Sequence, residues 1–224
     1  MNNSFEFALI CFTSLFAMIN PFGIIPVFKP MTAGMSHADA KAIARRACLV
    51  AFLMLLVFAV AGKFLFDFFG ISINSLKIVG GIIFFMLGYE LLQAKFSKMK
   101  YDNVRLAKDR VEFEDHSKDI AITPLAIPIL CGPGAIANVI ILMHEGSSIP
   151  QKISLLGAIL AVMLINYFGL VGANRLLDLL GDSGNKVMMR IMGMIVMVIA
   201  VEFFLSGARP VLIDIMSTAA MQAR

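Results

Sequence analysis

Six apolar runs occupy most of this 224-residue chain, and each is long enough to cross a lipid bilayer as a helix. We expect these spans at residues 5–27, 47–69, 74–93, 120–143, 153–177 and 187–205. Hydrocarbon offers no hydrogen-bond partners to a backbone, so a spanning segment must pair its own N–H and C=O groups, and an α-helix does this within one segment. The sequence therefore predicts an all-α, polytopic membrane protein with six transmembrane helices.

The composition excludes several other classes of protein. Hydrophobic residues make up 59% of the chain and charged residues 15%, against roughly 25% charged residues in an average soluble domain. The cysteines lie far apart in apolar runs without CxxC spacing, so we expect buried thiols and neither a disulfide nor a metal site. They are Cys11, Cys48 and Cys131. The histidines all fall between the apolar runs, so we expect no enzyme activity and no cofactor. The positive residues are confined to particular loops, which is an orientation signal, so we expect no nucleic-acid partner.

Two of the apolar runs contain residues that break helices. Asn20-Pro21-Phe22-Gly23 lies in the first run, followed by Pro26, and Cys131-Gly132-Pro133-Gly134 lies at the matching place in the fourth. Proline removes a backbone donor and clashes with the preceding turn, and each glycine weakens a helix by about 1 kcal/mol. Broken helices in corresponding halves of a membrane protein are typical of a transporter's binding site. The alternative is that these residues only kink the helices or let them pack closely.

Matching residues at a nearly constant offset indicate an internal duplication. Pro21 matches Pro133, and Glu90 matches Glu202. The other matching pairs are Asp67 with Asp178, Gly70 with Gly181, Asn74 with Asn185, and Gly81 with Gly193. Three spans per half is an odd number, so the second copy must enter the membrane from the opposite side, which predicts two inverted 3+3 repeats. We expect the first three-helix repeat at 1–93, a charged linker at 94–119 and the second repeat at 120–224.

The positive charges predict the orientation of the chain in its membrane. Fourteen of the nineteen Lys and Arg residues follow the first, third and fifth spans, and seven of these lie in the linker 94–119. Loops on the cytoplasmic side carry the excess of Lys and Arg. We therefore expect a cytoplasmic linker, with both termini on the periplasmic or extracellular side.

Two motifs connect the chain to a known family. They are Asn20-Pro-Phe-Gly-Ile-Ile-Pro-Val-Phe in the first span and Ala126-Ile-Pro-Ile-Leu-Cys-Gly-Pro-Gly-Ala-Ile in the fourth. Together with the six-span length, they resemble the MarC family (UPF0056) of bacterial and archaeal inner-membrane proteins, and the resemblance covers essentially the whole chain. Members with an assigned activity are similar to transporters of small neutral amino acids such as glycine and alanine. The resemblance implies such a transport activity, and a location in the bacterial inner membrane.

The broken helices also suit a small zwitterion. A half-helix that starts near Pro133 or Gly134 aims its N-terminal amides at a carboxylate, while the carbonyls that end the preceding half-helix accept an ammonium group. Glycines leave room for a close backbone approach, and Asn20 or Asn138 adds a side-chain hydrogen bond. The expected substrate-binding residues are Asn20, Pro21, Gly23, Gly132, Pro133, Gly134 and Asn138.

Four acidic residues lie at or near the ends of the apolar runs. Asp67 and Asp178 each have a basic residue at helical spacing, which favours local ion pairs. Glu90 and Glu202 have no such partner within their runs, so they are the candidates for coupling transport to protons. The alternative is that all four carboxylates lie at the membrane surface.

Two other classes of function compete with secondary transport. A passive channel or an exporter of another small solute would share both breaks, but a channel would conduct without saturation and without an ion gradient. A purely structural membrane protein would not need two interruptions at equivalent places. Asn166 and Tyr167, midway along the fifth span, either reach the site or bond between helices. The expected partners are a small-molecule substrate and the lipid bilayer, and a homo-oligomer is compatible with the sequence.

Overall fold

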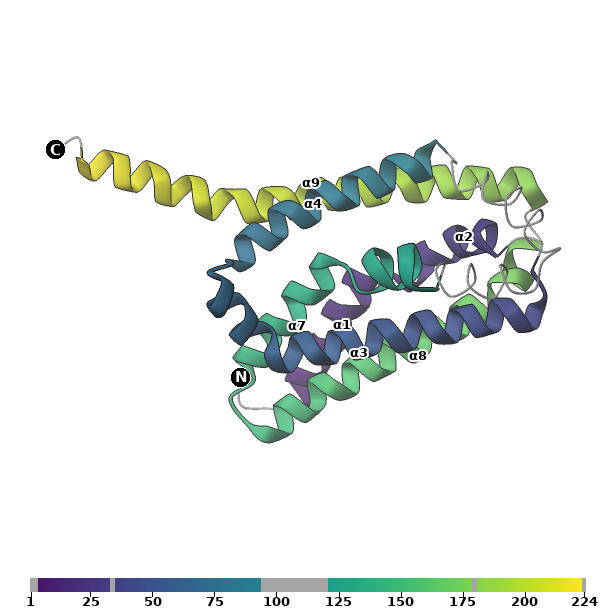
Figure 1. The fold of residues 1–224 in the computed structure, drawn as a ribbon, viewed down its shortest axis with the longest axis horizontal. Coiled ribbons are helices and arrows are strands. Elements are labelled where there is room, and N and C mark those ends of the chain that lie inside the picture. Colours follow the sequence, from purple (N-terminus) through teal and green to yellow (C-terminus); the bar gives the residue numbers. More distant parts are fainter. Residues whose placement is uncertain (1–3, 33–34, 94–120, 179–180, 223–224) are drawn as a thin grey trace.

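The computed structural model describes residues 4–32, 35–93, 121–178 and 181–222, which form helices joined by short turns (Figure 1). The helices are α1 (Ser4–Ile19), α2 (Pro21–Met31), α3 (His37–Phe69), α4 (Ile73–Leu92), η1 (Ala121–Leu130), α7 (Pro133–Glu145), α8 (Ile149–Asp178) and α9 (Gly181–Gln222). These described ranges contain no strand, which confirms the all-α prediction. The expected linker at 94–119 lies outside the described residues.

Five helical segments within the described ranges are long and apolar enough to cross a membrane. They are Ser4–Ile25, His37–Phe69, Ile73–Leu92, Ile149–Gly172 and Lys186–Ser217. The sixth expected span, 120–143, is instead divided between η1 with 10 residues and α7 with 13. A helix needs about 20 residues to cross the hydrocarbon core, so neither half crosses it alone. The multi-pass prediction is supported by five long spans, and the fourth run is broken where its glycines and proline lie.

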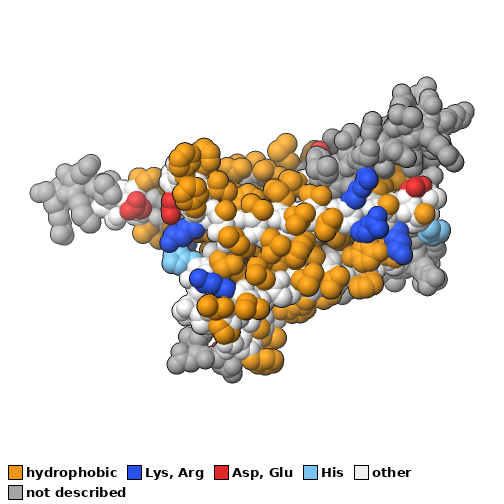
Figure 2. Space-filling model, turned by 60° about the horizontal axis from the view of Figure 1, so that its bottom comes forward, with side chains coloured by type: hydrophobic (Ala, Val, Ile, Leu, Met, Phe, Trp, Pro, Cys, Tyr) orange, Lys and Arg blue, Asp and Glu red, His pale blue; other side chains and the backbone are white. Residues whose placement is uncertain are grey.

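The surface of the molecule suits a lipid environment. In Figure 2, hydrophobic side chains cover the middle of the visible face, and charged side chains gather toward its two ends. Along α3, large apolar side chains such as Leu53, Val57 and Val60 are exposed. Lipid tails are as apolar as a protein core, so these side chains are well solvated by a bilayer.

Local residue chemistry sets the ends of α3 and α4. Ser36 caps α3 by accepting the N–H of Asp39 at 3.2 Å. From there α3 continues unbroken to Phe69, so it begins ten residues before the expected span 47–69. Gly70 ends α3 in the left-handed conformation, with a φ of 64° that suits glycine. The next helix, α4, is capped by Ser72. The predicted span began two residues later, at Asn74.

The helices form two groups that lie side by side in Figure 1. In one group, α8 packs against α1 and α2, while α3 packs against η1 and α7. In the other, α4 pairs with α9. Both termini lie toward the same end of the molecule, and the last turns of α9, which continue well past residue 205, project beyond the rest of the helices (Figure 1).

A buried core lies where the broken helices meet α3 and α8. The inner face of α1 carries residues spaced four apart, each at most 3% exposed, as expected for one stripe of a helix. They are Phe7, Cys11, Leu15 and Ile19. All three cysteines, Cys11, Cys48 and Cys131, are buried, which confirms the prediction of buried thiols.

Small residues bring α4 and α9 into backbone contact. The two helices run antiparallel, and these residues recur every seven positions on each helix. The facing pairs are Asn74 with Gly207, Gly81 with Ala200, and Gly88 with Gly193. A β-carbon built on Gly193 would lie 2.6 Å from the Leu92 nitrogen and 2.7 Å from the Gly88 oxygen. Such a seam of small residues is typical of helix packing in membranes. The two helices therefore form one closely packed unit.

Replacing Gly193 by alanine is expected to force α4 and α9 apart and to lower the free energy of unfolding by about 1–3 kcal/mol, the usual cost of overpacking. The atoms that a methyl group would meet belong to the backbone, so no side chain can move aside. Thermal unfolding in detergent measures the change. Gly157→Ala in α8 is the matched control, because nothing lies within 4 Å of the β-carbon there. An unchanged melting temperature for Gly193→Ala would contradict this close approach.

Candidate functional site

The first break separates α1 from α2 at Asn20. The Asn20 N–H donates to Phe16 O at 3.0 Å and closes α1. Asn20 then takes a φ of 48°, in the left-handed region that asparagine adopts more readily than most residues. The Gly23 N–H donates to Asn20 O at 3.0 Å and to Asn20 Oδ1 at 3.3 Å. The Asn20 side chain therefore caps α2, which starts at Pro21.

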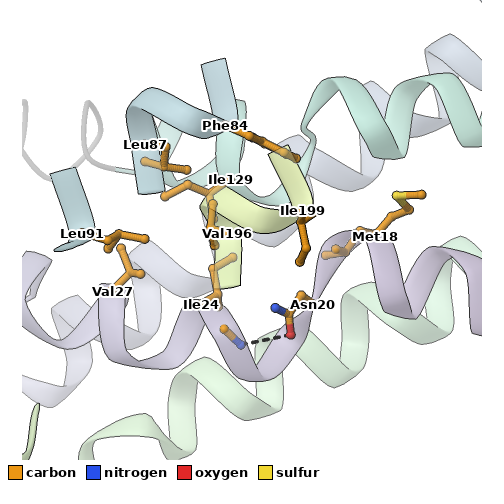
Figure 3. A pocket seen from close by; sticks show the side chains of 12 residues that line it. Met18, Asn20, Ile24, Val27, Phe84, Leu87, Leu91, Ile129, Val196 and Ile199 are labelled. Carbon is orange, nitrogen blue, oxygen red and sulfur yellow. Dashed lines mark hydrogen bonds between the residues drawn. The ribbon is translucent and has the colours of Figure 1, made fainter. Parts of the chain in front are cut away.

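A pocket of about 60 Å³ lies against this break, between α2 and the α4–α9 pair (Figure 3). It is lined by Met18, Ile19, Asn20, Gly23, Ile24, Val27, Phe84, Leu87, Leu91, Ile129, Val196 and Ile199. Among these described residues, Asn20 alone has a polar side chain. Its Oδ1 accepts the Gly23 N–H, which leaves the Nδ2 group as the donor in the pocket (Figure 3). The pocket is thus an apolar chamber with one amide donor at the helix break.

The second break separates η1 from α7 at Cys131 and Gly132. The wide helix η1 ends with a bond from the Cys131 N–H to Ala126 O, five residues back, at 2.8 Å. Gly132 precedes α7 in an extended conformation and provides no side-chain cap. Pro133, at the first helical position, has no N–H to donate. The first-turn amides of α7 therefore lack a side-chain acceptor from the capping residue, and they carry the partial positive charge of a helix N-terminus.

Apolar side chains separate these amides from the pocket. A β-carbon built on Gly134 would lie 3.4 Å from Met18 Sδ and 3.5 Å from the ring of Phe203. Met18 also lines the pocket, so its flexible side chain stands between the pocket and the start of α7. On α4, a β-carbon at Gly80 would lie 2.5 Å from Pro133 Cβ, which shows how closely α4 covers this break. The second break is therefore buried, whereas the first borders a pocket.

One polar contact joins α7 to α1. The Asn138 Nδ2 group donates to Ser14 Oγ at 2.7 Å. On the other side of the breaks, the pocket lies between α2 and η1, because Ile24 of α2 and Ile129 of η1 both line it. The region around the breaks is thus closed between α1 and α7 and open between α2 and η1.

The structure brings some of the sequence-predicted site residues together. Asn20 and Gly23 line the pocket. Pro21 begins α2, and Asn138 bonds to Ser14 away from the pocket lining. The buried start of α7, behind Met18, contains Gly132, Pro133 and Gly134.

The two candidate coupling residues lie apart from this group. Glu90 on α4 and Glu202 on α9 are exposed, and neither is among the described residues that line the pocket. Sequence reasoning missed Met18 and Phe203, because apolar residues carry no distinguishing signal in a chain this hydrophobic. The one available signal was the position of Met18, two residues before the break.

Comparison with known proteins identifies the family. Residues 5–212 match the family described as MarC family integral membrane protein. The chain belongs to the MarC family. The UPF0056 membrane protein YvbG of Bacillus subtilis is 37% identical over 211 residues, which cover 93% of this chain and 98% of the relative. A UPF0056 membrane protein of Methanocaldococcus jannaschii is 32% identical over 208 residues, with the same coverage of 93% and 98%.

The MarC match supports the fold and the membrane, and it includes both helix breaks and the pocket. It confirms the resemblance that the two motifs indicated. The names of these MarC relatives state a membrane protein and no substrate. No solved structure matches the chain. The function of this MarC protein therefore has to be argued from its own site.

Proposed function

We propose that this protein is a secondary transporter of small neutral amino acids of the glycine and alanine type, which binds its substrate between the two helix breaks. The observation that carries the proposal is the pocket at Asn20. It places an amide donor in an apolar chamber, and the Met18 side chain stands between this chamber and the start of α7. Helix breaks of this kind expose backbone groups that can replace the water around a zwitterion.

The pocket suits a substrate with a small, uncharged side chain. Its volume of about 60 Å³ is a few times the roughly 10–15 Å³ that one water molecule needs. Walls such as Ile24, Leu87 and Val196 favour an alkyl group, and they make burial of a charged side chain costly. The carboxylate binds to Asn20 Nδ2, and reaches the α7 amides when the Met18 side chain moves aside. The ammonium group binds to carbonyl oxygens that the break at Asn20 frees.

The pairing of the helices supports alternating access between two inverted repeats. If the two halves are exchanged, α8 corresponds to α3, η1 to α1 and α7 to α2. The contacts of α8 with α1 and α2 then correspond to the contacts of α3 with η1 and α7. In this proposal η1 and α7 together form the sixth crossing. The contact between α1 and α7 is the exception. Exchange of the two halves turns it into a contact between α2 and η1, and the pocket lies between those two helices instead. We assign this structure to one state of the transport cycle, and exchange of these two contacts gives the other.

We place the protein in the bacterial inner membrane with the linker in the cytoplasm and both termini outside. The charge distribution of the sequence supports this orientation. The pocket extends from Met18 near the break to Val27 and Leu91, close to the ends of α2 and α4. In the proposed orientation, the substrate site therefore opens toward the cytoplasm in this state.

Uptake into proteoliposomes tests the transport function. Labelled glycine and alanine are expected to enter with saturable kinetics, to compete with each other and to accumulate under an imposed proton gradient. Lysine and glutamate are expected to compete poorly, because the pocket walls are apolar. A flux that rises linearly with concentration and ignores the gradient would identify a passive channel. Saturable transport of a different solute alone would refute the substrate class.

The same assay tests coupling through the two glutamates. In Glu90→Gln and Glu202→Gln, exchange of substrate is expected to continue while accumulation driven by the gradient fails, since glutamine keeps most hydrogen bonds but carries no proton. Both residues are exposed. Normal accumulation in both variants would therefore assign these carboxylates to the membrane surface.

A further inference from the structure

A second cavity, of about 530 Å³, lies at the end of the molecule where α3 turns into α4 and where α7 ends. Figure 1 shows these segments at the same end as the start of α1. The polar residues of its lining are Lys63, Asp67, Ser72, Asn74, His144 and Glu145. A cavity with charges of both signs therefore lies outside the site described above.

One hydrogen bond holds the positive charge of this cavity in place. Lys63 Nζ on α3 lies 3.0 Å from His144 Nε2 on α7. An ammonium group only donates, so the imidazole nitrogen accepts and His144 is neutral in this contact. Lys63 keeps two further N–H groups for a ligand. The sequence favoured an ion pair of Lys63 with Asp67, but among the described residues Lys63 bonds to His144 and forms no ion pair.

The negative charges of the cavity belong to two different helices. Asp67 is one helical turn after Lys63 on α3, and Glu145 follows His144 at the end of α7. Within the described part of the chain, neither carboxylate takes part in an ion pair. The cavity thus offers charges of both signs that are not paired with one another, and such a lining is complementary to a ligand that itself carries both signs.

Simpler ligands match this lining less well. The described residues contain no group of three or more His, Cys, Asp or Glu side chains that could hold a metal ion. A simple anion would meet the two carboxylates, and a simple cation would meet the Lys63 ammonium. A small zwitterion turns both into attractions, because its carboxylate can bind to Lys63 and its ammonium group to Asp67 or Glu145.

The cavity shares the helix α7 with the proposed transport path. A β-carbon built on Gly62 of α3 would lie 2.6 Å from Cγ1 of Ile140, which lines the cavity, so α7 packs closely on α3 there. Two residues before Ile140, Asn138 bonds to Ser14 on the closed side of the breaks. One wall of the cavity therefore belongs to the helix whose contact with α1 has to open in the proposed cycle.

We propose that this cavity is a second binding site for amino acids, on the outer side of the membrane in the proposed orientation. Lys63 binds the carboxylate, and Asp67 and Glu145 bind the ammonium group. The inference rests on the proposed transport function and adds a site to it. The cavity of about 530 Å³ is far larger than the pocket of about 60 Å³ at Asn20, so water remains around the bound side chain. The outer site therefore recognises the two charges and accepts neutral side chains of different sizes.

Protection of a cysteine in the cavity tests this site. Ile71, an exposed residue of the lining, is replaced in Ile71→Cys within a variant without the native cysteines. The rate at which a water-soluble reagent modifies this thiol is measured on the purified full chain in detergent. Glycine, alanine and leucine are expected to slow the modification several-fold and to saturate. Acetate and methylammonium each carry one of the two charges, so they should need about 10- to 100-fold higher concentrations.

Substitutions in the same background assign the charges. Lys63→Gln should raise the half-protecting glycine concentration by about 10- to 100-fold and leave that of methylammonium no higher, because only the carboxylate loses its partner. Lys77→Gln is the matched control, since Lys77 lies beside Ser206 and outside the cavity lining. Asn20→Gly, which changes the other pocket, should keep the protection too. Unchanged protection by glycine in Lys63→Gln would overturn the site, and so would loss of protection in Asn20→Gly.

Two further measurements separate this proposal from its alternatives. Protection that depends on Lys63, without uptake of any amino acid, would refute the transport function and retain the outer site. Saturable uptake of glycine without any protection of Ile71→Cys would retain the transporter and refute the outer site. The headgroup of phosphatidylethanolamine carries the same two kinds of charge. Protection by this lipid in the micelles, with none by glycine, would assign the cavity to a lipid and overturn the proposal.

Discussion

Glycine in place of Asn20 is expected to weaken substrate binding by about 10- to 100-fold, because a hydrogen bond to a charged group contributes roughly 1.5–3 kcal/mol. The Asn20 Nδ2 group is the side-chain donor of the pocket. Glycine adopts the φ of 48° at this position without strain, so the break itself is preserved. The loss should therefore appear as a higher KM for uptake, with little change in the melting temperature.

Two other substitutions at this position separate the amide from the backbone. Asn20→Asp keeps the shape and the acceptor for Gly23 but places a negative charge where the carboxylate binds, so it should transport no better than Asn20→Gly. Asn20→Leu lacks the amide and is strained at positive φ by roughly 1–2 kcal/mol, so it should lose stability as well as transport. Uptake kinetics and thermal unfolding give the two readouts. A wild-type KM for Asn20→Gly would mean that the substrate binds elsewhere.

Joining α1 to α7 is expected to stop transport almost completely. Asn138 and Ser14 hold these helices together at 2.7 Å, on the closed side of the breaks. Alternating access requires this contact to open once in every cycle. Ser14→Cys and Asn138→Cys are combined in a variant without the native cysteines, and the pair is linked by a short bifunctional thiol reagent that a reductant cleaves. Uptake should disappear on linking and return on cleavage.

A link within the α4–α9 pair is the control for this experiment. Lys77 Nζ lies 3.4 Å from Ser206 Oγ, and the two helices are packed through their backbones. Lys77→Cys with Ser206→Cys, treated with the same reagent, should therefore keep most of its transport. Full activity of the linked Ser14–Asn138 variant would show that α1 and α7 remain together throughout the cycle, and it would contradict the proposed exchange of contacts.

The sequence by itself determined the features that depend on neighbouring residues. Ser36 and Gly70 mark the ends of α3 because capping and positive φ are local properties of the chain. Asn20 breaks the first run, and the Gly-Pro-Gly segment breaks the fourth, because the backbone there lacks donors or favours other conformations. The length of the apolar runs determined that most of these helices cross a membrane.

Only the tertiary structure decided which face of each helix meets protein and which meets lipid. On α4, Gly81 and Gly88 are buried against α9, while Phe85 and Met86 are exposed. In a soluble protein the large apolar side chains would mark the core, but lipid is as apolar as the core, so hydrophobic periodicity does not separate the two. The seven-residue spacing of small residues was the informative pattern, and its partner helix lies about 100 residues away in the sequence.

The same reason explains what the sequence did not decide at the site. Met18 lies between the pocket and the start of α7, and Glu90 and Glu202 turn outward, through packing between segments that are distant in sequence. Local chemistry placed both breaks, but contacts between helices made one of them a pocket and buried the other. Asn166 was visible as a polar residue in an apolar run. Its burial, with no partner for Oδ1 among the described residues, follows from the packing of α8 against α1, α2 and α3.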